Sequence, residues 1–185
     1  MKTETPERVA RLAGATNFRR VVYSQEELAR RVGEMGVEIS DHYPEEEAIL
    51  VLGLLKGSFI FLADLVRTIQ RPLQVDFLVA ASYGTGMVSS GEVQLLYDPD
   101  TSIEGRHVVL VEDIVDSGNT LQQILPVLED RNPASLEVCA LLHKRLVKLE
   151  REPRWVGFNA PSEFLVGYGL DHAEDFRHLP FIGSL

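Results

Sequence analysis

The sequence lacks several features that would each mark a particular class of protein. It holds a single cysteine, Cys139, which cannot form a disulfide within the chain, so we expect a reducing compartment, the cytoplasm. No apolar run approaches the roughly 18 residues of a membrane-spanning helix. The charged N-terminus also has no apolar stretch of the kind found in signal peptides. No membrane partner is therefore expected.

Positive charge is also scarce. The chain has 18 lysines and arginines against 28 aspartates and glutamates, a formal net charge of −10. Such a balance disfavours nucleic acid and anionic membranes as general partners, and an anionic substrate must be held by local groups or by a metal ion. The 185 residues, 45% of them hydrophobic, suffice for one domain with a single substantial core.

The most informative stretch, residues 107–120, is neither a Walker A loop nor a Gly-x-Gly-x-x-Gly motif. It begins with the run Val108–Val111, which is typical of a strand buried on both faces. A helical pattern of leucines and isoleucine opens at Leu121. Between strand and helix lies a turn with small and hydroxyl residues, Ser117, Gly118, Asn119 and Thr120. Backbone N–H groups at such a helix N-terminus suit a phosphate.

Three carboxylates, Glu112, Asp113 and Asp116, stand beside that turn. An ordinary strand followed by a capped helix would need no ligand, but three carboxylates exceed what capping requires. They suit a ligand that carries hydroxyl groups, such as a phosphorylated sugar, or one that brings a divalent cation, such as a pyrophosphate–Mg²⁺ complex.

Residues 111–121, Val-Glu-Asp-Ile-Val-Asp-Ser-Gly-Asn-Thr-Leu, resemble the phosphoribosyl pyrophosphate (PRPP) signature of the type I phosphoribosyltransferases. Glu-Asp followed by Asp three residues on is most similar to the hypoxanthine-guanine branch. The resemblance implies a purine salvage enzyme that transfers 5-phosphoribosyl from PRPP to N9 of hypoxanthine or guanine. The products are IMP or GMP and diphosphate, Mg²⁺ is the cofactor, and the assembly is a homodimer or homotetramer.

The implied fold is α/β, a mostly parallel central sheet flanked by helices in one domain of residues 1–185. Its core covers about residues 45–145, and a small hood over the sheet edge comes from about residues 1–20 and 150–185. The residue pattern itself predicts a capping box at Ser24 and Glu27, followed by a helix. It also predicts helices from residues 59 and 121, and strands over residues 48–55, 75–81, 93–97, 107–111, 135–142 and 155–158.

Two further turns are similar to segments of the same family. Lys56 and Gly57 follow the strand 48–55 and resemble the pyrophosphate-binding segment, where the Lys-Gly peptide is often cis and aims a backbone N–H at the diphosphate. Residues 82–91 are rich in glycine and hydroxyl groups, which suits a hairpin connection or a mobile lid. In the family such a loop begins with Ser-Tyr and covers the PRPP site, as Ser82 and Tyr83 would here.

The resemblance assigns the remaining roles residue by residue. Asp116 is implied as the catalytic base that takes the proton from N7 of the purine. Asp171 is implied as a metal ligand together with Glu112 and Asp113. The residues implied to bind PRPP are Lys56, Gly57, Ser82, Tyr83, Glu112, Asp113, Asp116, Ser117, Gly118, Asn119, Thr120 and Arg177.

The purine site is implied by two stretches. Lys144 follows the strand 135–142. It could simply be a solvent-exposed residue at the end of the strand, but the resembling family has there a lysine that donates to O6 of a 6-oxopurine. Phe164 is implied to stack on the base and Leu165 to contact its edge through the backbone. The vertebrate branch tends to have lysine where Glu163 stands, so the preference among hypoxanthine, guanine and xanthine stays open.

Two other classes of function fit parts of the pattern. A PRPP- or nucleotide-sensing regulator would need a basic face or an added helix-turn-helix, and the acidic chain has no spare segment for one. A phosphohydrolase with Asp113 or Asp116 as nucleophile usually has Asp-x-Asp spacing, but these two aspartates are three residues apart. A xanthine-preferring transferase remains within the main interpretation.

Overall fold

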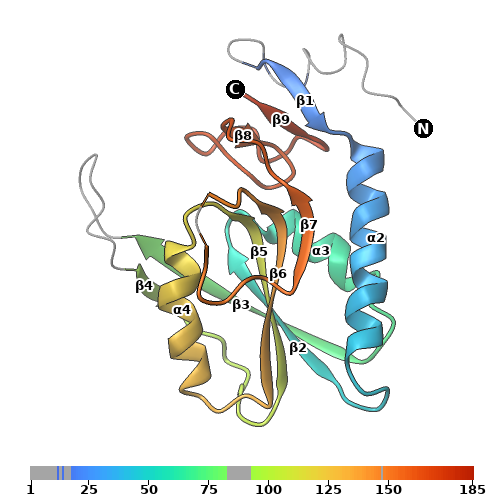
Figure 1. The fold of residues 1–185 in the computed structure, drawn as a ribbon, viewed down its shortest axis with the longest axis vertical. Helices are drawn as coiled ribbons and strands as arrows, with labels where there is room; N and C mark the ends of the chain where they lie inside the picture. Colours follow the sequence, from blue (N-terminus) through green and yellow to red (C-terminus); the bar gives the residue numbers. More distant parts are fainter. Residues whose placement is uncertain (1–11, 13, 15–17, 83–92, 147) are drawn as a thin grey trace.

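The computed structural model describes residues 12, 14, 18–82, 93–146 and 148–185, and the structural statements below refer to these residues. Figure 1 shows a broad sheet below and a small sheet above. The elements are β1 (Arg20–Tyr23), α2 (Gln25–His42), β2 (Ile49–Leu55), α3 (Phe59–Val66), β3 (Leu73–Ser82), β4 (Val93–Tyr97), β5 (His107–Val115), α4 (Asn119–Glu129), β6 (Ser135–His143), β7 (Trp155–Asn159), β8 (Leu165–Val166) and β9 (Ile182–Ser184).

The larger sheet has six strands in the order β4-β3-β2-β5-β6-β7. All neighbouring pairs are parallel except β3 with β4, so the predicted α/β fold with a mostly parallel sheet is confirmed. The register aligns Gly53 with Val111 and Glu112 with Ala140. The turns that leave β2, β5 and β6 therefore emerge side by side at one edge.

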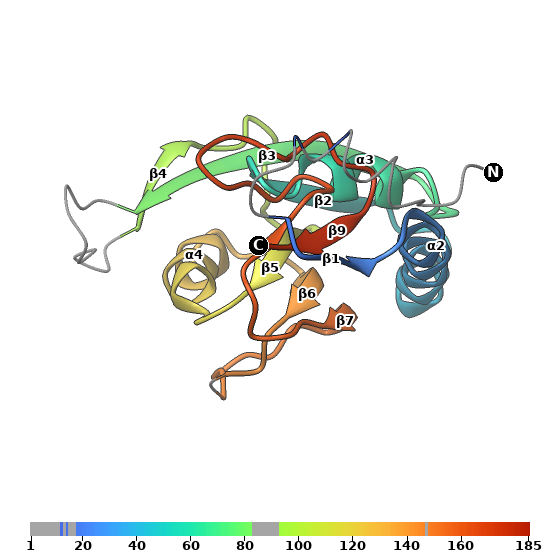
Figure 2. The same ribbon diagram turned by 90° about the horizontal axis from the view of Figure 1, so that it is seen from above.

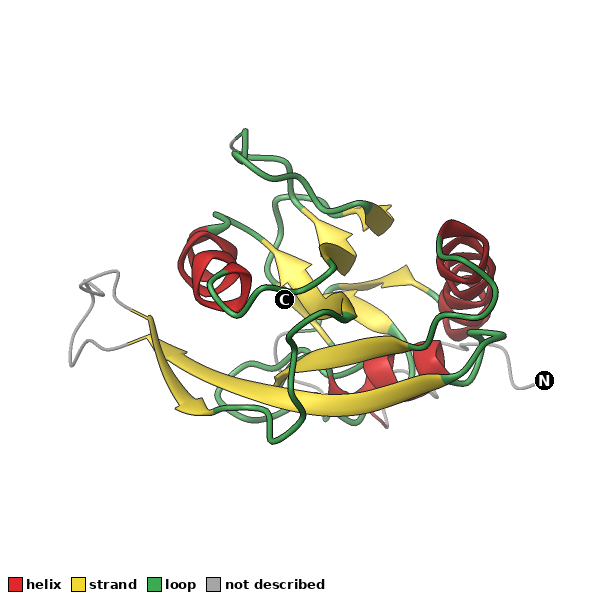
Figure 3. Ribbon diagram, turned by 90° about the horizontal axis from the view of Figure 1, so that it is seen from below, coloured by secondary structure: helices red, strands yellow, loops and turns green. Residues whose placement is uncertain are grey.

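Helices cover both faces of this sheet (Figures 2 and 3). Side chains of α2 and α3 pack with Val51 of β2 in one hydrophobic cluster, whereas those of α4 pack with Leu50 and Leu52 in the other. Successive residues of β2 thus pack into the cores on opposite faces of the sheet, which explains the unbroken apolar run of this strand. The predicted capping box is present, and the predicted helix faces are buried: Leu28, Val32, Met35 and Ile39 in α2, and Leu121, Ile124, Leu125 and Leu128 in α4.

Strand β3 is longer than the predicted span of 75–81, and its buried face carries a carboxylate. Leu78 is fully buried and Asp76 nearly so, whereas Val75 and Phe77 are 38% and 37% exposed. Asp76 accepts hydrogen bonds from the N–H groups of Phe77 and Thr101. Burial alone would raise the pKa of Asp76, but these hydrogen bonds hold it below its usual value. Asp76 thereby fastens the turn that follows β4 to the sheet.

The small sheet has the order β1-β9-β8 and is antiparallel. We call this sheet, together with the loops of residues 160–185, the hood. It brings β1 beside the C-terminal strand above the large sheet (Figure 1).

Cys139 is a buried free thiol. No helix of the described ranges is long and apolar enough to cross a membrane. The predicted lid loop falls almost entirely on residues 83–92, outside the described residues; Ser82 ends β3.

Candidate functional site

The turns after β5 and β6 meet at the edge of the large sheet. The Lys144 N–H donates to the carbonyl of Val115 at 2.9 Å, which continues the β5–β6 pairing beyond the strands. This contact sets the Lys144 ammonium 2.8 Å from Oδ2 of Asp116. The lysine side chain is only 12% exposed, and the aspartate is 51% exposed. The predicted base and the predicted purine-binding lysine are therefore partners.

A small cavity lies at the start of α4. Its volume is about 80 Å³, and its lining includes Glu112, Asp116, Ser117, Gly118 and Thr120. Gly118 precedes the helix in a left-handed conformation with φ of 77°, and no acidic residue occupies the first turn. The positive end of the helix dipole is therefore not offset by a carboxylate from that turn, which suits an anion.

Glu112 is buried and Asp113 half-buried near the end of β5. Burial, and then the neighbouring Asp113, raise the pKa of Glu112 well above its usual value. Burial raises the pKa of Asp113 to about 6, although backbone N–H groups and Arg177 oppose the shift. Oε2 of Glu112 has no hydrogen-bond partner among the described residues. Such a costly arrangement is typical of a site that binds a ligand.

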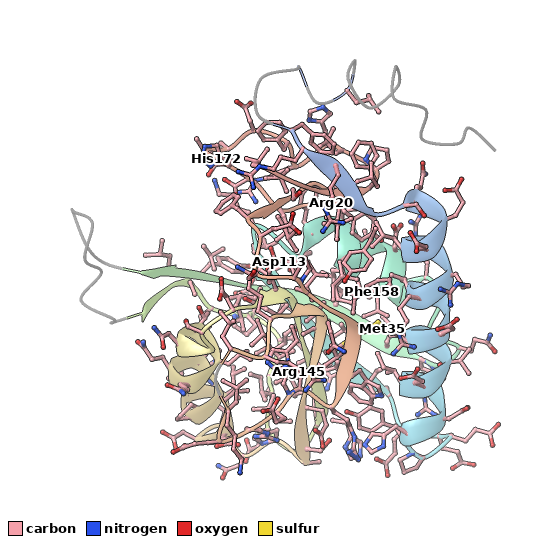
Figure 4. The ribbon with its side chains drawn as sticks, turned by 45° about the horizontal axis from the view of Figure 1, so that its top comes forward. Arg20, Met35, Asp113, Arg145, Phe158 and His172 are labelled. Atoms are coloured by element: carbon pink, nitrogen blue, oxygen red, sulfur yellow. The ribbon has the colours of Figure 1, made fainter. Side chains whose placement is uncertain are left out.

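Gly57 lies in close contact with the Asp113 side chain on one side and with the backbone of Gly169 on the other. A Cβ on Gly57 would lie 1.7 Å from Oδ2 of Asp113, and a Cβ on Gly169 would lie 2.1 Å from the carbonyl oxygen of Gly57. Gly169 also has φ of 105°, a conformation that other residues rarely adopt. The turn after β2 is therefore held between the carboxylate of the sheet and the backbone of the hood. In Figure 4, Asp113 lies where the sheet meets the hood, below His172.

A charged cluster covers this junction from the hood. The Lys56 ammonium donates to both carboxylate oxygens of Glu174 at 2.9 Å. Arg177 pairs with Oδ1 of Asp171 at 2.8 Å and with Glu174 at 3.4 Å. It also donates to the carbonyl of Gly169 at 2.8 Å. Both cations predicted to meet diphosphate thus converge on one place.

The predicted stacking residue is available to a ligand. Phe164 is 53% exposed, and its ring meets His172 edge-on with 5.4 Å between centroids. Leu165 is buried in β8, where it pairs with Ser184 of β9. The neighbouring Glu163 forms an ion pair with Arg20 of β1 at 2.5 Å, and this hydrogen bond lowers the pKa of Glu163. The carboxylate that departs from the vertebrate pattern is therefore neutralised within the hood.

The carboxylates at the junction fit a magnesium ion that arrives with a phosphorylated substrate. Oε2 of Glu112 is buried and unpartnered among the described residues, and Asp171 lies close enough to raise the pKa of Asp113. Nowhere in the described ranges do three His, Cys, Asp or Glu side chains form a complete metal cage. Mg²⁺ usually takes one or two protein carboxylates and fills its other positions with waters and phosphates, so two or three dispersed carboxylates suffice.

Most of the predicted site residues lie at this edge of the sheet, but the cis peptide is not at the expected bond. The cis peptide joins Leu55 to Lys56, one bond before the Lys56–Gly57 peptide that the resemblance implied. Neither bond precedes a proline, so no sequence signal separates them. Tyr83 lies outside the described residues, and Ser82 is placed only as the end of β3.

Three residues of the junction were missed: Gly169, Glu174 and Arg20. The Gly-Tyr-Gly triplet of residues 167–169 signalled a close backbone approach without naming what it approached. Glu174 was identifiable only as an acidic residue between Asp171 and Arg177. Its partner Lys56 is 118 positions away in the sequence, and that of Glu163, Arg20, is 143 positions away. Such pairings arise only from the fold.

Comparison with known proteins agrees with this geometry. A family model described as phosphoribosyl transferase domain matches residues 21–173. Hypoxanthine phosphoribosyltransferase of Buchnera aphidicola is 45% identical over 90% of this chain and 95% of its own length. The Escherichia coli protein of the same name is 44% identical over 89% and 94%. A crystal structure of a hypoxanthine-guanine phosphoribosyltransferase from Bacillus anthracis superposes with a TM-score of 0.84 at 42% identity, covering 91% of this chain and 99% of that one.

Gly57→Ala tests the close approach at the junction. The added methyl group would overlap Oδ2 of Asp113, so either the carboxylate or the turn must move. We expect binding of a phosphorylated ligand to weaken by at least tenfold, with a melting temperature several degrees lower. The control is Gly33→Ala, a site in α2 with nothing within 4 Å, where the higher helix propensity of alanine should raise the melting temperature slightly. Unchanged ligand binding in Gly57→Ala would contradict the assignment.

The raised pKa of Asp113 predicts the pH dependence of stability in the ligand-free protein. Ionising this carboxyl costs more in the folded chain than in the unfolded chain. Its contribution to folding is therefore fully present below about pH 4 and lost as the pH rises through about 6, a difference of about 3 kcal/mol. Asp113→Asn should accordingly melt higher than the parent at pH 7.5, with the difference shrinking towards pH 4.

The measurement is a set of melting curves from pH 4 to 8 in the presence of a chelator. Asp175→Asn, which removes a carboxylate from an exposed position of the hood, is the control and should follow the parent at every pH. A melting temperature of Asp113→Asn below that of the parent at pH 7.5 would show that burial of the charge is not the dominant effect.

Proposed function

The chain belongs to the phosphoribosyl transferase domain family, and on that basis we propose that it is a hypoxanthine or hypoxanthine-guanine phosphoribosyltransferase. It would transfer the 5-phosphoribosyl group of PRPP to N9 of a 6-oxopurine, giving IMP or GMP and diphosphate in purine salvage. The relatives named hypoxanthine phosphoribosyltransferase cover about 90% of the chain at 44–45% identity.

One observation carries the proposal. The carboxylate Asp116, which lines the cavity at the start of α4, lies 2.8 Å from the Lys144 ammonium. A base and a purine-recognising donor are thus adjacent to a phosphate-sized cavity, as transfer between a sugar phosphate and a purine requires. A binding protein would need the cavity but not the neighbouring base.

In the proposed reaction, the C1′–O bond of PRPP breaks and its electron pair leaves with diphosphate. N9 of the purine forms the new bond to C1′, and the N7 proton passes to Asp116. Ser117, Gly118, Asn119 and Thr120 hold the 5′-phosphate at the start of α4. Glu112 and Asp113 hold the ribose hydroxyls, and their negative field favours the positive charge that develops on the sugar.

The same carboxylates, with Asp171, would hold Mg²⁺, which neutralises the departing diphosphate. Burial favours the protonated forms of Glu112 and Asp113. Binding of a cation or of a developing positive charge favours the ionised forms, so substrate binding would lower the pKa of both carboxyls. Lys56 and the Gly57 backbone, together with Arg177, meet the diphosphate from the side of the hood. The family resemblance assigns Ser82 and Tyr83 to a lid that would exclude water.

The purine lies between the sheet and the hood. Phe164 stacks on its face, Leu165 contacts its edge through the backbone, and Lys144 donates to O6. Adenine carries a donor in place of O6, which would leave the buried ammonium facing another donor. The Glu163 carboxylate does not oppose this selection, because Arg20 neutralises it.

We also infer a single domain that works in the cytoplasm as a homodimer or homotetramer. The buried free thiol of Cys139 suits a reducing compartment. Val75 and Phe77 lie two residues apart on one face of β3, and each is more than a third exposed. Exposed apolar side chains of this kind suit contact with a second copy of the chain.

The direct test mixes the protein with PRPP, Mg²⁺ and hypoxanthine, guanine, xanthine or adenine in turn, while purine absorbance and diphosphate release are followed. Diphosphate release with hypoxanthine or guanine is expected, with little or none for adenine. Turnover of xanthine alone would reassign the substrate. Binding of PRPP without turnover of any base would favour the sensing role over the enzyme.

Asp116→Asn tests the base. Asparagine keeps the shape of the side chain but cannot take the N7 proton, so we expect kcat to fall by 100-fold or more. The KM for PRPP should change only severalfold, because the phosphate turn is intact. Steady-state kinetics at saturating hypoxanthine measure both constants. An unchanged kcat would remove Asp116 from this role.

Lys144→Ala tests recognition of O6. Loss of the ammonium should raise the KM for hypoxanthine at least tenfold and narrow the preference over adenine. Arg145→Ala is the matched control, because Arg145 follows Lys144 but its guanidinium bonds to Asn159 instead. Ratios of kcat/KM for the two bases give the result, and an unaltered ratio in Lys144→Ala would refute the contact.

A further inference from the structure

The hood contains a carboxylate to which the proposed reaction assigns no role, although it touches two of the proposed diphosphate ligands. Both oxygens of Glu174 accept from the Lys56 ammonium at 2.9 Å. One of them also lies 3.4 Å from the Arg177 guanidinium. A carboxylate bound by two oxygens between a lysine and an arginine presents the same acceptors as a phosphate group.

The backbone around Glu174 is shaped to present this side chain. Ala173 and Glu174 both have left-handed backbone conformations, with φ of 52° and 69°. The Glu174 N–H donates to Oδ2 of Asp171 at 2.9 Å, and the backbones of His172 and Asp175 bond to each other on either side. The turn is thereby closed on itself, and it directs the Glu174 carboxylate towards the turn after β2.

The contact with Lys56 is nevertheless easily broken. The side chains of Lys56 and Glu174 are 64% and 65% exposed, and an exposed ion pair contributes little free energy because water competes for both charges. A diphosphate, with a greater charge and more oxygens, would outcompete one carboxylate for the same cations. The pair is therefore stable enough to form and weak enough to exchange.

We propose that Glu174 occupies the diphosphate subsite in the ligand-free protein and competes there with diphosphate for Lys56 and Arg177. This inference rests on the proposed function and adds to it a residue that controls product release. When PRPP binds, its diphosphate replaces the Glu174 carboxylate as the partner of Lys56 and Arg177. The carboxylate pairs with them again as diphosphate leaves. Return of Glu174 thus lowers the affinity for the product without opposing the transfer step itself.

Two other roles for Glu174 predict that its removal would not strengthen the binding of diphosphate. If Glu174 served as a metal ligand, its loss would weaken the binding of magnesium diphosphate. If it only fastened the hood to the turn after β2, its loss would free both cations from their positions and again weaken binding or leave it unchanged. Competition alone predicts that removing the charge makes diphosphate bind more tightly.

The test compares the parent protein with Glu174→Gln by titration calorimetry with sodium diphosphate in excess MgCl₂. Glutamine keeps the length of the side chain but removes its charge. We expect the Kd of Glu174→Gln to be about three- to tenfold lower than that of the parent, the size expected for the loss of exposed ion pairs. The inhibition constant of diphosphate in the transferase assay should fall by the same factor. Glu174→Ala should behave alike, which guards against an effect peculiar to glutamine.

Asp175→Asn is the matched control, because it removes the same charge from the adjacent, exposed residue of the same turn. Its Kd should equal that of the parent, which separates a specific contact from a change in net charge. An equal or higher Kd in Glu174→Gln, or an equal gain in Asp175→Asn, would overturn the inference and leave the transferase proposal standing. If the parent itself binds no diphosphate and transfers no phosphoribosyl group, both the role of Glu174 and the transferase proposal are refuted.

Discussion

The close approach of Gly57 to its two neighbours is the constraint on which the rest of the site depends. On one side lies the Asp113 carboxylate at the end of β5, and on the other lies the backbone of Gly169 in the hood. No side chain fits between these segments, so the large sheet, the turn after β2 and the hood are held at fixed separations. The proposed ligands of ribose, diphosphate and purine come from these different segments. Their relative positions therefore follow from the two close contacts of Gly57.

The ligand-free site balances its charges internally. Lys144 pairs with Asp116, Lys56 with Glu174, and Arg177 with Asp171. In a chain with a net charge of −10, a free cationic pocket would attract many small anions, whereas paired cations bind only a ligand that can replace a carboxylate. Glu112 has no such partner, and burial raises the pKa of both Glu112 and Asp113, so their ionised forms are costly until a ligand compensates the charge. Selectivity for a large, highly charged substrate follows from both arrangements.

Local patterns in the sequence predicted local structure well. The capping box at Ser24, the buried face of α2 and the strand β4 all follow from spacing or composition over a few residues. The acidic stretch of residues 112–116, which lies in the last part of β5 and the turn after it, identified the site because its residues are close together in the sequence. The face of β3 was not predictable in the same way, since the buried Asp76 is satisfied by the N–H of Thr101, 25 positions away, as well as by that of its neighbour Phe77. The ion pairs of Lys56 and Arg20 join segments more than a hundred positions apart, and no period or motif encodes such a meeting.

The pairing of β1 with β9 has a consequence for any shortened form of the chain. β9 is the middle strand of the hood, with β8 on its other side. Without β1, the backbone groups of Ile182, Gly183 and Ser184 would form an open sheet edge next to apolar side chains, a template on which other chains can assemble. The same loss would strip Glu163 of its counter-charge beside Phe164. Trimming the molecule from that end would thus cost solubility and active-site order together.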